Sequence, residues 1–295
     1  MSFICHNFRL IKFNFICQVF SQMLEFEDMK CLECNSNTGY PICDKCKQYP
    51  FLVEACRQKL ASSRSLDLLK KTYTSSFAEV NNLNSKIFWD KNFENVGRLK
   101  DQDRMTRERV GVVAKLIPKG ALTVLDIGIG LGFVEELIAK RKLIRLYGND
   151  ISSKAITSAR ERFAGQFKLE SLNSMEYSKN YFDAVLLLEV LEHVSPSKTF
   201  SLLKKIGSYL KKEGVFVLSI PINEGLEYMS ENPNGHVRVY TEKLIEAELN
   251  IAGFDLIILK KFYAFKNYYL VKKILSKILV NRWRPNVLVI QARKI

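Results

Sequence analysis

Short, nearly continuous apolar runs alternate with segments of helical periodicity from Leu122 to the C-terminus. Runs without polar interruption are typical of parallel strands covered on both faces, whereas half-exposed strands alternate apolar and polar residues. The segment 197–214 has helical spacing and ends in Glu-Gly, which indicates a helix that stops there. This order predicts an α/β domain over residues 106–295, with helices on both faces of its sheet. The predicted strands are "LTVLDIG", "LIRLYGND", "FKLESL", "FDAVLLLEV", "VFVLSIPI", "DLIILKKFYAF" and "NVLVIQARK".

Three segments with other patterns precede this domain. Residues 1–28 are apolar but interrupted by charged and polar residues, and they lack the apolar core and cleavage site of a secretory signal. We expect them to be an extension without ordered structure, with an amphipathic anchor as the alternative. Residues 29–50 hold a cysteine cluster, and residues 51–105 are mostly helical, which predicts a linker or cap.

The cysteine cluster predicts a structural zinc site. Cys31, Cys34, Cys43 and Cys46 have the spacing C-x2-C-x8-C-x2-C. Each C-x-x-C pair presents two thiolates, and two such pairs complete a tetrahedron around Zn²⁺ in a zinc-ribbon-like module. An iron site or a redox-active dithiol is the alternative. Because the seven cysteines are an odd number and four are clustered, we expect a cytoplasmic protein rather than a disulfide framework.

A glycine-rich loop follows the first predicted strand of the α/β domain. Asp126 is followed by Gly128, Gly130 and Gly132 in the order D-x-G-x-G-x-G. A dinucleotide fingerprint needs its third glycine one residue later, where Phe133 stands, and the Gly-Lys-Ser/Thr of a P-loop is absent. For Gly132, close packing of helix on strand is the alternative to a ligand contact.

The acids around this loop indicate a nucleoside without phosphates. Asp126, before the glycines, suits a ligand with a positive amine or sulfonium, and Asp150 can accept hydrogen bonds from both ribose hydroxyls. Helix capping is the alternative role of both acids. Both, however, end predicted parallel strands, where ligands bind in open α/β sheets. S-adenosylmethionine fits this description.

Five blocks of the sequence resemble the class I S-adenosylmethionine-dependent methyltransferases, across residues 85–295. They are "VLDIGIGLG", "GND", "FDAVLLLEVLEHV", "GVFVLSIP" and "GHVRVYTEKLIEAELNIAGF". The resemblance implies a Rossmann-like sheet of seven strands with the last strand antiparallel. It also implies that the glycines approach the methionine part of the cofactor, that Asp126 lies near its amino group and that Asp150 binds the ribose. Adenine would meet "ESLNSMEY", where the family usually has an acid and this chain has Ser171, Leu172 and Asn173.

The block "EVLEHV" contains candidate catalytic and metal-binding residues after the fourth strand. Glu189, Glu192 and His193 suit Mg²⁺, Mn²⁺ or Zn²⁺, and His236 follows the fifth strand. The block resembles that of ubiquinone-biosynthesis O-methyltransferases, and also that of small-RNA 2′-O-methyltransferases, in which two glutamates and two histidines hold a metal. Without a metal, His193 or His236 would be a general base. The alternative is that Glu189 orients the cofactor loop or caps a helix.

The C-terminal segment carries most of the net charge of +14. Residues 256–295 contain ten Lys/Arg and no Asp or Glu. Within residues 266–285, apolar residues from Leu270 to Leu279 recur at helical spacing, apart from Lys272, Lys273 and Lys277. We therefore expect a basic amphipathic helix that contacts a membrane, covers the active site or steers an acidic substrate. A stripe packed on its own domain is the ordinary alternative.

Together these patterns predict a methyltransferase that acts on a hydroxyl of a small or lipid-linked molecule. An RNA methyltransferase that uses the zinc module and the basic tail is the second hypothesis. A non-catalytic S-adenosylmethionine-binding module is the third. Zinc modules precede some rRNA guanine methyltransferases and some deoxysugar C-methyltransferases, but this chain matches neither pattern completely. No run of about 18 uncharged apolar residues occurs, so no transmembrane helix is expected.

Overall fold

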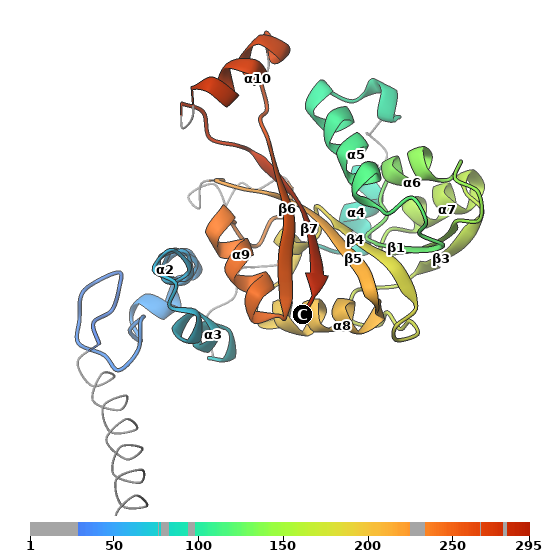
Figure 1. The fold of residues 1–295 in the computed structure, drawn as a ribbon. Helices are drawn as coiled ribbons and strands as arrows, with labels where there is room; N and C mark the ends of the chain where they lie inside the picture. The colour runs from blue at the N-terminus through green and yellow to red at the C-terminus, as the bar shows by residue number, and fades with distance from the viewer. Residues whose placement is uncertain are drawn as a thin grey trace, which may run out of the picture. The chain divides into compact units, whose positions relative to one another are not determined.

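The computed structural model describes residues 29–75, 77, 83–93, 98–224, 234–265, 267–279 and 282–295. The chain divides into two compact units, residues 1–79 and 80–295 (Figure 1). The predicted N-terminal extension, residues 1–28, lies outside the described residues. Among the helices of the described ranges, none is long and apolar enough to cross a membrane.

Unit 1 consists of the cysteine cluster followed by η1 (Cys46–Gln48) and the helix pair α2 (Pro50–Ser62) and α3 (Leu66–Thr74). Pro50 begins α2, where its missing N–H costs no helical hydrogen bond. The buried Arg57 ties the two helices together, because it pairs with Glu54 at 3.0 Å and donates to the carbonyl of Thr72 at 3.0 Å. The helical segment 51–105 also continues into unit 2 as α4 (Lys86–Phe93) and η2 (Leu99–Asp101).

Unit 2 is built on a seven-stranded sheet of order β3-β2-β1-β4-β5-β7-β6. Strands β1 to β5 are parallel, and β7 runs antiparallel to both β5 and β6. The predicted Rossmann-like sheet with an antiparallel last strand is therefore confirmed. The strands are β1 (Thr123–Ile127), β2 (Arg145–Asp150), β3 (Gly165–Leu169), β4 (Phe182–Leu188), β5 (Leu210–Pro221), β6 (Phe254–Phe262) and β7 (Val287–Lys294).

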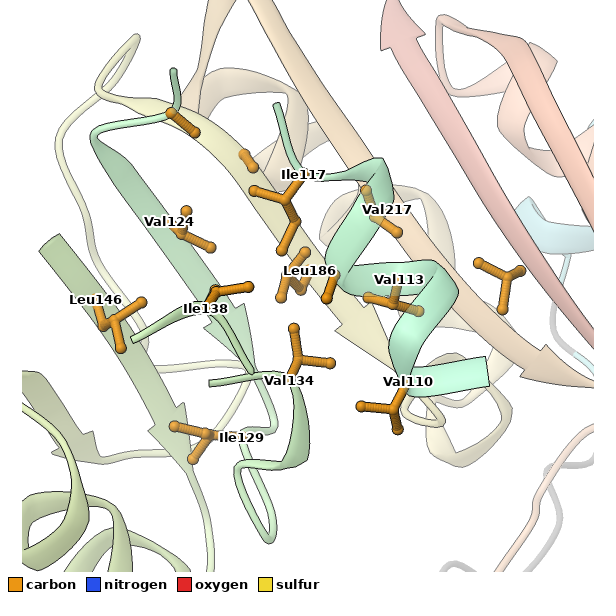
Figure 2. Close-up of a cluster of buried hydrophobic side chains, with 14 of the residues drawn as sticks. Val110, Val113, Ile117, Val124, Ile129, Val134, Ile138, Leu146, Leu186 and Val217 are labelled. Atoms are coloured by element: carbon orange, nitrogen blue, oxygen red, sulfur yellow. The ribbon is translucent and has the colours of Figure 1, made fainter. Parts of the chain in front are cut away.

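Helices cover both faces of this sheet. Alternate residues of the central strands, among them Val124, Leu186 and Val217, pack with Val113 and Ile138 of the covering helices in one apolar cluster (Figure 2). Because successive strand residues point to opposite faces, the residues between them face the second helical layer, which includes α8 and α9. The helices are α5 (Arg104–Leu116), α6 (Phe133–Ile138), α7 (Ser153–Arg162), η3 (Leu191–His193), α8 (Pro196–Tyr209), α9 (Glu242–Ile251) and α10 (Tyr269–Ile278).

The helix predicted over residues 197–214 ends earlier than its sequence indicates. α8 stops at Tyr209 and β5 begins at Leu210, which pairs with Phe182. The Glu-Gly signal is therefore wrong as a helix stop, because Gly214 lies inside the strand. A Cβ there would lie 2.9 Å from the carbonyl oxygen of Phe182, so glycine permits the close approach of the two strands.

Strand directions place two distant segments at the same edge of the sheet. The carboxyl ends of the parallel strands define this edge, and Pro221, near the end of β5, pairs with Val287, the first residue of β7. Val287 also pairs with Phe262, the last residue of β6. The glycine loop after β1 and the segment carrying α10 therefore both leave the sheet at its carboxyl edge (Figure 1).

Candidate active site

A cavity of about 610 Å³ opens at the carboxyl edge of β1, β2 and β4. Eight of the residues singled out in the sequence line it, namely Gly128, Gly130, Asp150, Ser171, Leu172, Asn173, Glu189 and His193. Asp126, Gly132, Glu192 and His236 are not among its described wall residues. The structure therefore gathers the glycine loop, the acid after β2 and part of "EVLEHV" around one space.

The glycine loop has a left-handed backbone, and its glycines differ in what surrounds them. Gly130 has a φ of 48°, and a Cβ added there would meet nothing closer than 3.9 Å, so this position leaves open space beside the cavity. Gly132 has a φ of 63°, and its added Cβ would lie 2.7 Å from the Phe163 ring. The surroundings of Gly132 thus match the alternative of close packing, at the start of α6.

Asp150 joins the end of β2 to the glycine loop. Its Oδ2 accepts a hydrogen bond from the Gly130 N–H at 2.9 Å, and its Oδ1 accepts one from the Ser152 N–H at 2.8 Å. Burial raises the pKa of Asp150, and these two N–H donors act against that rise. Since each carboxylate oxygen has two lone pairs, both can still accept from a ribose hydroxyl. The acid fits a nucleoside.

Asp126 lies beneath the loop, beside a second acid. Its side chain is buried, and the carboxyl group of Glu135 in α6 acts on it electrostatically. Burial raises the pKa of Asp126 well above its usual range and raises that of Glu135 to about 7. Because both groups are buried, it is unfavourable for both to carry a negative charge at the same time. The predicted contact of Asp126 with the cofactor amino group stays a prediction.

The wall next to β3 holds an acid that the sequence analysis missed. Glu170 lines the cavity directly after β3, and its buried Oε1 has no hydrogen-bond partner among the described residues. Asn149 also lines the cavity, and its buried Oδ1 has no hydrogen-bond partner among the described residues. Ser171 instead contacts Ser174, with 3.1 Å between their hydroxyl oxygens. The position of Glu170 directly after a parallel strand, like that of Asp150, is the signal that could have identified it.

Helix α4 supplies a second group of wall residues that the sequence analysis missed. Trp89, Asn92 and Phe93 line the cavity from this helix. Asp90 fixes α4 in place, because its carboxylate accepts hydrogen bonds from the hydroxyls of Ser152 at 2.7 Å and Ser153 at 2.9 Å. Hydrogen bonds, first of all from Lys86, hold the pKa of Asp90 well below its usual range. No local motif marks these wall residues in the sequence.

His193 lines the cavity, and its Nε2 lies 3.9 Å from Oε1 of the buried Glu192. Its Nδ1 lies 3.1 Å from the carbonyl oxygen of Gly235, which can only accept, so Nδ1 carries the proton and Nε2 has the lone pair. Burial lowers the pKa of His193 to about 4, which keeps the ring neutral at physiological pH. The ring packs edge-on against Trp89, with 4.9 Å between centroids.

Of the predicted divalent-metal set, Glu192 and His193 lie in one cluster of possible ligands among the described residues, and Glu189 is not part of that cluster. The carboxylate of Glu189 pairs with Arg109 at 2.5 Å and accepts a hydrogen bond from Ser219 at 2.8 Å. Glu189 has a φ of 55°, a left-handed conformation in which the chain turns between β4 and η3. It remains on the cavity wall, consistent with the alternative that it orients the cofactor loop.

His236 takes the place of Glu189 in the acid–imidazole cluster. One ligand atom each of Glu192, His193 and His236 lies within 4.8 Å of the others. Glu192 is fully buried, neither carboxylate oxygen has a hydrogen-bond partner among the described residues, and burial raises its pKa well above its usual range. A set of two imidazoles and one carboxylate fits Zn²⁺ or Mn²⁺ and does not fit Mg²⁺, which prefers oxygen ligands.

The four clustered cysteines of unit 1 converge as their spacing predicts. One sulfur atom each of Cys31, Cys34, Cys43 and Cys46 lies within 4.8 Å of the others. The sulfurs of Cys34 and Cys43 are 3.5 Å apart, and the N–H of Cys46 points to the sulfur of Cys43 at 3.4 Å. This hydrogen bond is the main cause that lowers the pKa of Cys43, to about 6. The set fits a closed four-thiolate zinc site.

The strand order, the glycine loop after β1 and the acid after β2 define the class I S-adenosylmethionine-dependent methyltransferase fold. Residues 125–218 match the family described as "Methyltransferase domain". The structure is similar to the N-methyltransferase NodS from Bradyrhizobium japonicum WM9, solved in complex with S-adenosyl-l-homocysteine. The TM-score is 0.55 at 16% identity, over 72% of this chain and 98% of that one. At this identity the likeness shows the fold alone.

Two curated relatives match shorter stretches of the chain. The cyclopropane-fatty-acyl-phospholipid synthase of Escherichia coli strain K12 is 29% identical over 107 residues, 36% of this chain and 28% of the relative. The carboxy-S-adenosyl-L-methionine synthase of Nautilia profundicola is 32% identical over 100 residues, 32% of this chain and 43% of the relative. The chain thus spans less than half the length of each.

Proposed function

We propose that this protein is an S-adenosylmethionine-dependent methyltransferase that methylates a hydroxyl group of a small or lipid-linked molecule. One observation carries the proposal: a single wall joins the glycine loop, Asp150 and the neutral imidazole of His193. The loop and Asp150 suit a nucleoside donor. His193 suits an acceptor that gives up a proton.

Each wall residue contacts a different part of the methyl donor. Asp150 holds the two ribose hydroxyls, and Gly130 leaves room for the methionine part. Glu170 Oε1, which lacks a hydrogen-bond partner among the described residues, is placed to accept from the exocyclic amine of adenine. Glu189, held by Arg109, keeps the loop after β4 against the cavity. S-adenosylmethionine supplies a methyl group on a sulfonium, so the protein mainly aligns and desolvates the reactants.

The acceptor hydroxyl loses its proton to His193. As the acceptor oxygen bonds to the methyl carbon and the carbon–sulfur bond breaks, the proton passes to Nε2 of His193. The Gly235 carbonyl fixes the tautomer that this requires. We assign His236 a positioning role, because it stands behind His193, with 4.9 Å between ring centroids, and is outside the described cavity wall.

We also propose that Zn²⁺ occupies the four-cysteine site of unit 1. The supporting observation is the convergence of all four sulfurs, with Cys31 and Cys46 buried. We also propose the cytoplasm as the location of the protein, because thiols stay reduced in that compartment.

The proposed activity is tested with the full chain and S-adenosylmethionine labelled in its methyl group. The protein is incubated with separate lipid, small-molecule and RNA fractions of a cell extract. We expect label in the lipid or small-molecule fraction, in a bond that resists the mild base that cleaves esters. Label found in RNA alone would replace the proposed acceptor, and cofactor binding without S-adenosylhomocysteine in any fraction would contradict methyl transfer.

A further inference from the structure

Helix α10 presents its apolar side chains to solvent. Val271, Ile274 and Ile278 are 56%, 60% and 68% exposed, and no residue of the helix is buried. The half-buried positions are Tyr269, Lys272, Lys273 and Ser276, which recur at helical spacing on the opposite side. An ordinary surface helix turns its apolar stripe toward the core, so α10 has the reverse orientation.

Polar contacts from α5 hold this orientation. Glu108 accepts hydrogen bonds from the hydroxyl of Tyr269 at 2.9 Å and from the ammonium group of Lys273. The guanidinium of Arg104 lies 5.7 Å from the centre of the Tyr269 ring. If α10 rotated about its axis so that the apolar stripe faced the domain, these contacts would break. The outward stripe is therefore a built feature of unit 2.

Positive charge lies beside α10, on the side of the helix that faces α5 and β6. A cavity of about 770 Å³ lies between α5, β6 and α10, and Glu108 is the one acid on its described wall. The cationic residues on the wall of this cavity are Lys115, Lys260, Lys261, Lys273 and Lys277. Lys261 and Lys273 pair with Glu242 and Glu108, whereas Lys277, Arg282 and Arg284 are exposed cations in or directly after the helix that anionic headgroups could contact.

We propose that α10 is a docking surface for a bilayer containing anionic phospholipid. Its apolar stripe enters the boundary between headgroups and acyl chains, and the exposed cations in and after the helix contact lipid phosphates. This goes beyond methyl transfer and does not depend on it. A second copy of the chain would bring two basic surfaces together, and nucleic acid offers no apolar partner for Ile274 and Ile278. The charge therefore favours a membrane.

The position of α10 relates the docking surface to the cavity at the carboxyl edge of the sheet. Since α10 leaves the sheet at the carboxyl edge, a bilayer bound there faces the edge that holds the donor cavity. Neighbouring residues of α5 connect the two places, because Glu108 contacts α10 and Arg109 contacts Glu189 on the cavity wall. A lipid-linked acceptor could then reach the site without leaving the bilayer.

The test is co-sedimentation of the full chain with vesicles. One set contains phosphatidylcholine with phosphatidylglycerol, and the other phosphatidylcholine alone. We expect binding to the anionic vesicles that weakens as salt rises, and at least about tenfold weaker binding to the neutral vesicles. Equal binding to both vesicle types, or none to either, would overturn the proposal.

Variants locate the surface. The double variant I274D/I278D should lose at least about tenfold in vesicle binding, because two charges cannot enter the apolar boundary. Leu143→Asp, at a position 81% exposed in the loop before β2, should bind as the unchanged protein does. Unchanged cofactor binding and thermal unfolding would show that the variants fold, and the double variant K272E/K277E tests the charge independently. Wild-type binding by both double variants would exclude α10, and a change from dimer to monomer without vesicle binding would assign the stripe to a second copy.

Discussion

The N–H of Gly130 donates to Oδ2 of Asp150 over 2.9 Å, so the glycine loop is joined to the acid that ends β2. Two residues that are 20 positions apart in the sequence thereby present one surface. A ligand that uses Asp150 meets a loop whose geometry is preset, which lowers the entropic cost of binding.

Asp150→Ala should weaken binding of S-adenosylmethionine about 10- to 1,000-fold. The variant removes a charged acceptor of two ribose hydroxyls, each such bond being worth about 1.5–3 kcal/mol. Calorimetric titration measures the change. Asp150→Asn, which keeps one acceptor oxygen and the size of the side chain, is the matched comparison and should lose less. Affinities of both variants within about twofold of wild type would show that the ribose binds elsewhere.

His193→Gln should lower kcat by about 10²–10⁴-fold and leave cofactor affinity within about twofold, because glutamine cannot take up a proton. The wild-type rate should show no inflection from His193 between about pH 5 and 8, since the pKa of this histidine is lowered to about 4. His236→Gln should affect kcat less than His193→Gln does. Equal losses in the two variants, restored by added Zn²⁺ or Mn²⁺, would assign the histidines to a shared metal site instead.

Glu135→Gln should make the stability of unit 2 depend less on pH. The folded pKa of Glu135 is raised from 4.5 to about 7, so its contribution is complete below about pH 4.5 and is lost as pH rises through about 7. The difference is on the order of 3 kcal/mol for a fully buried group. Urea unfolding at several pH values measures it. Parallel stability curves for variant and wild type would mean that Glu135 titrates normally.

Purified, reduced protein should contain about one zinc per chain. Cys34→Ser should lose the metal, because three thiolates do not close the tetrahedron. Cys56→Ser changes a buried thiol outside the set and should keep it. Elemental analysis after dialysis measures the content, and zinc in neither wild type nor Cys56→Ser would contradict the site. Chelation should destabilise unit 1 and leave cofactor binding by unit 2 intact.

The sheet and the donor side of the site could be predicted because their signals are local. The apolar runs locate the strands, and the spacing of Gly128, Gly130 and Asp150 places them at one edge. Glu170 was missed because the predicted strand "FKLESL" includes it, whereas β3 ends one residue earlier, at Leu169. Helix α8 was predicted too long because the pairing of Leu210 with Phe182, distant in sequence, outweighs the local helix signal.

The acceptor side depends on contacts between distant residues. Glu189 belongs to the same short block as Glu192 and His193, yet its backbone turns the carboxylate toward Arg109 of α5 and Ser219 of β5. His236 approaches His193 from a different loop. Residue types can indicate that such a cluster exists, but only the fold decides which members meet.

The pairing of Phe262 with Val287 allows the segment between them to change independently of the sheet. These residues hold the two ends of segment 263–286 together, and the cost of closing a loop rises only slowly with its length. The segment can therefore be exchanged, lengthened or shortened while β6 and β7 remain paired and the cavity beside the glycine loop stays unchanged. We expect a chimera that carries another protein's segment between these two residues to bind S-adenosylmethionine unchanged and to dock to a different surface.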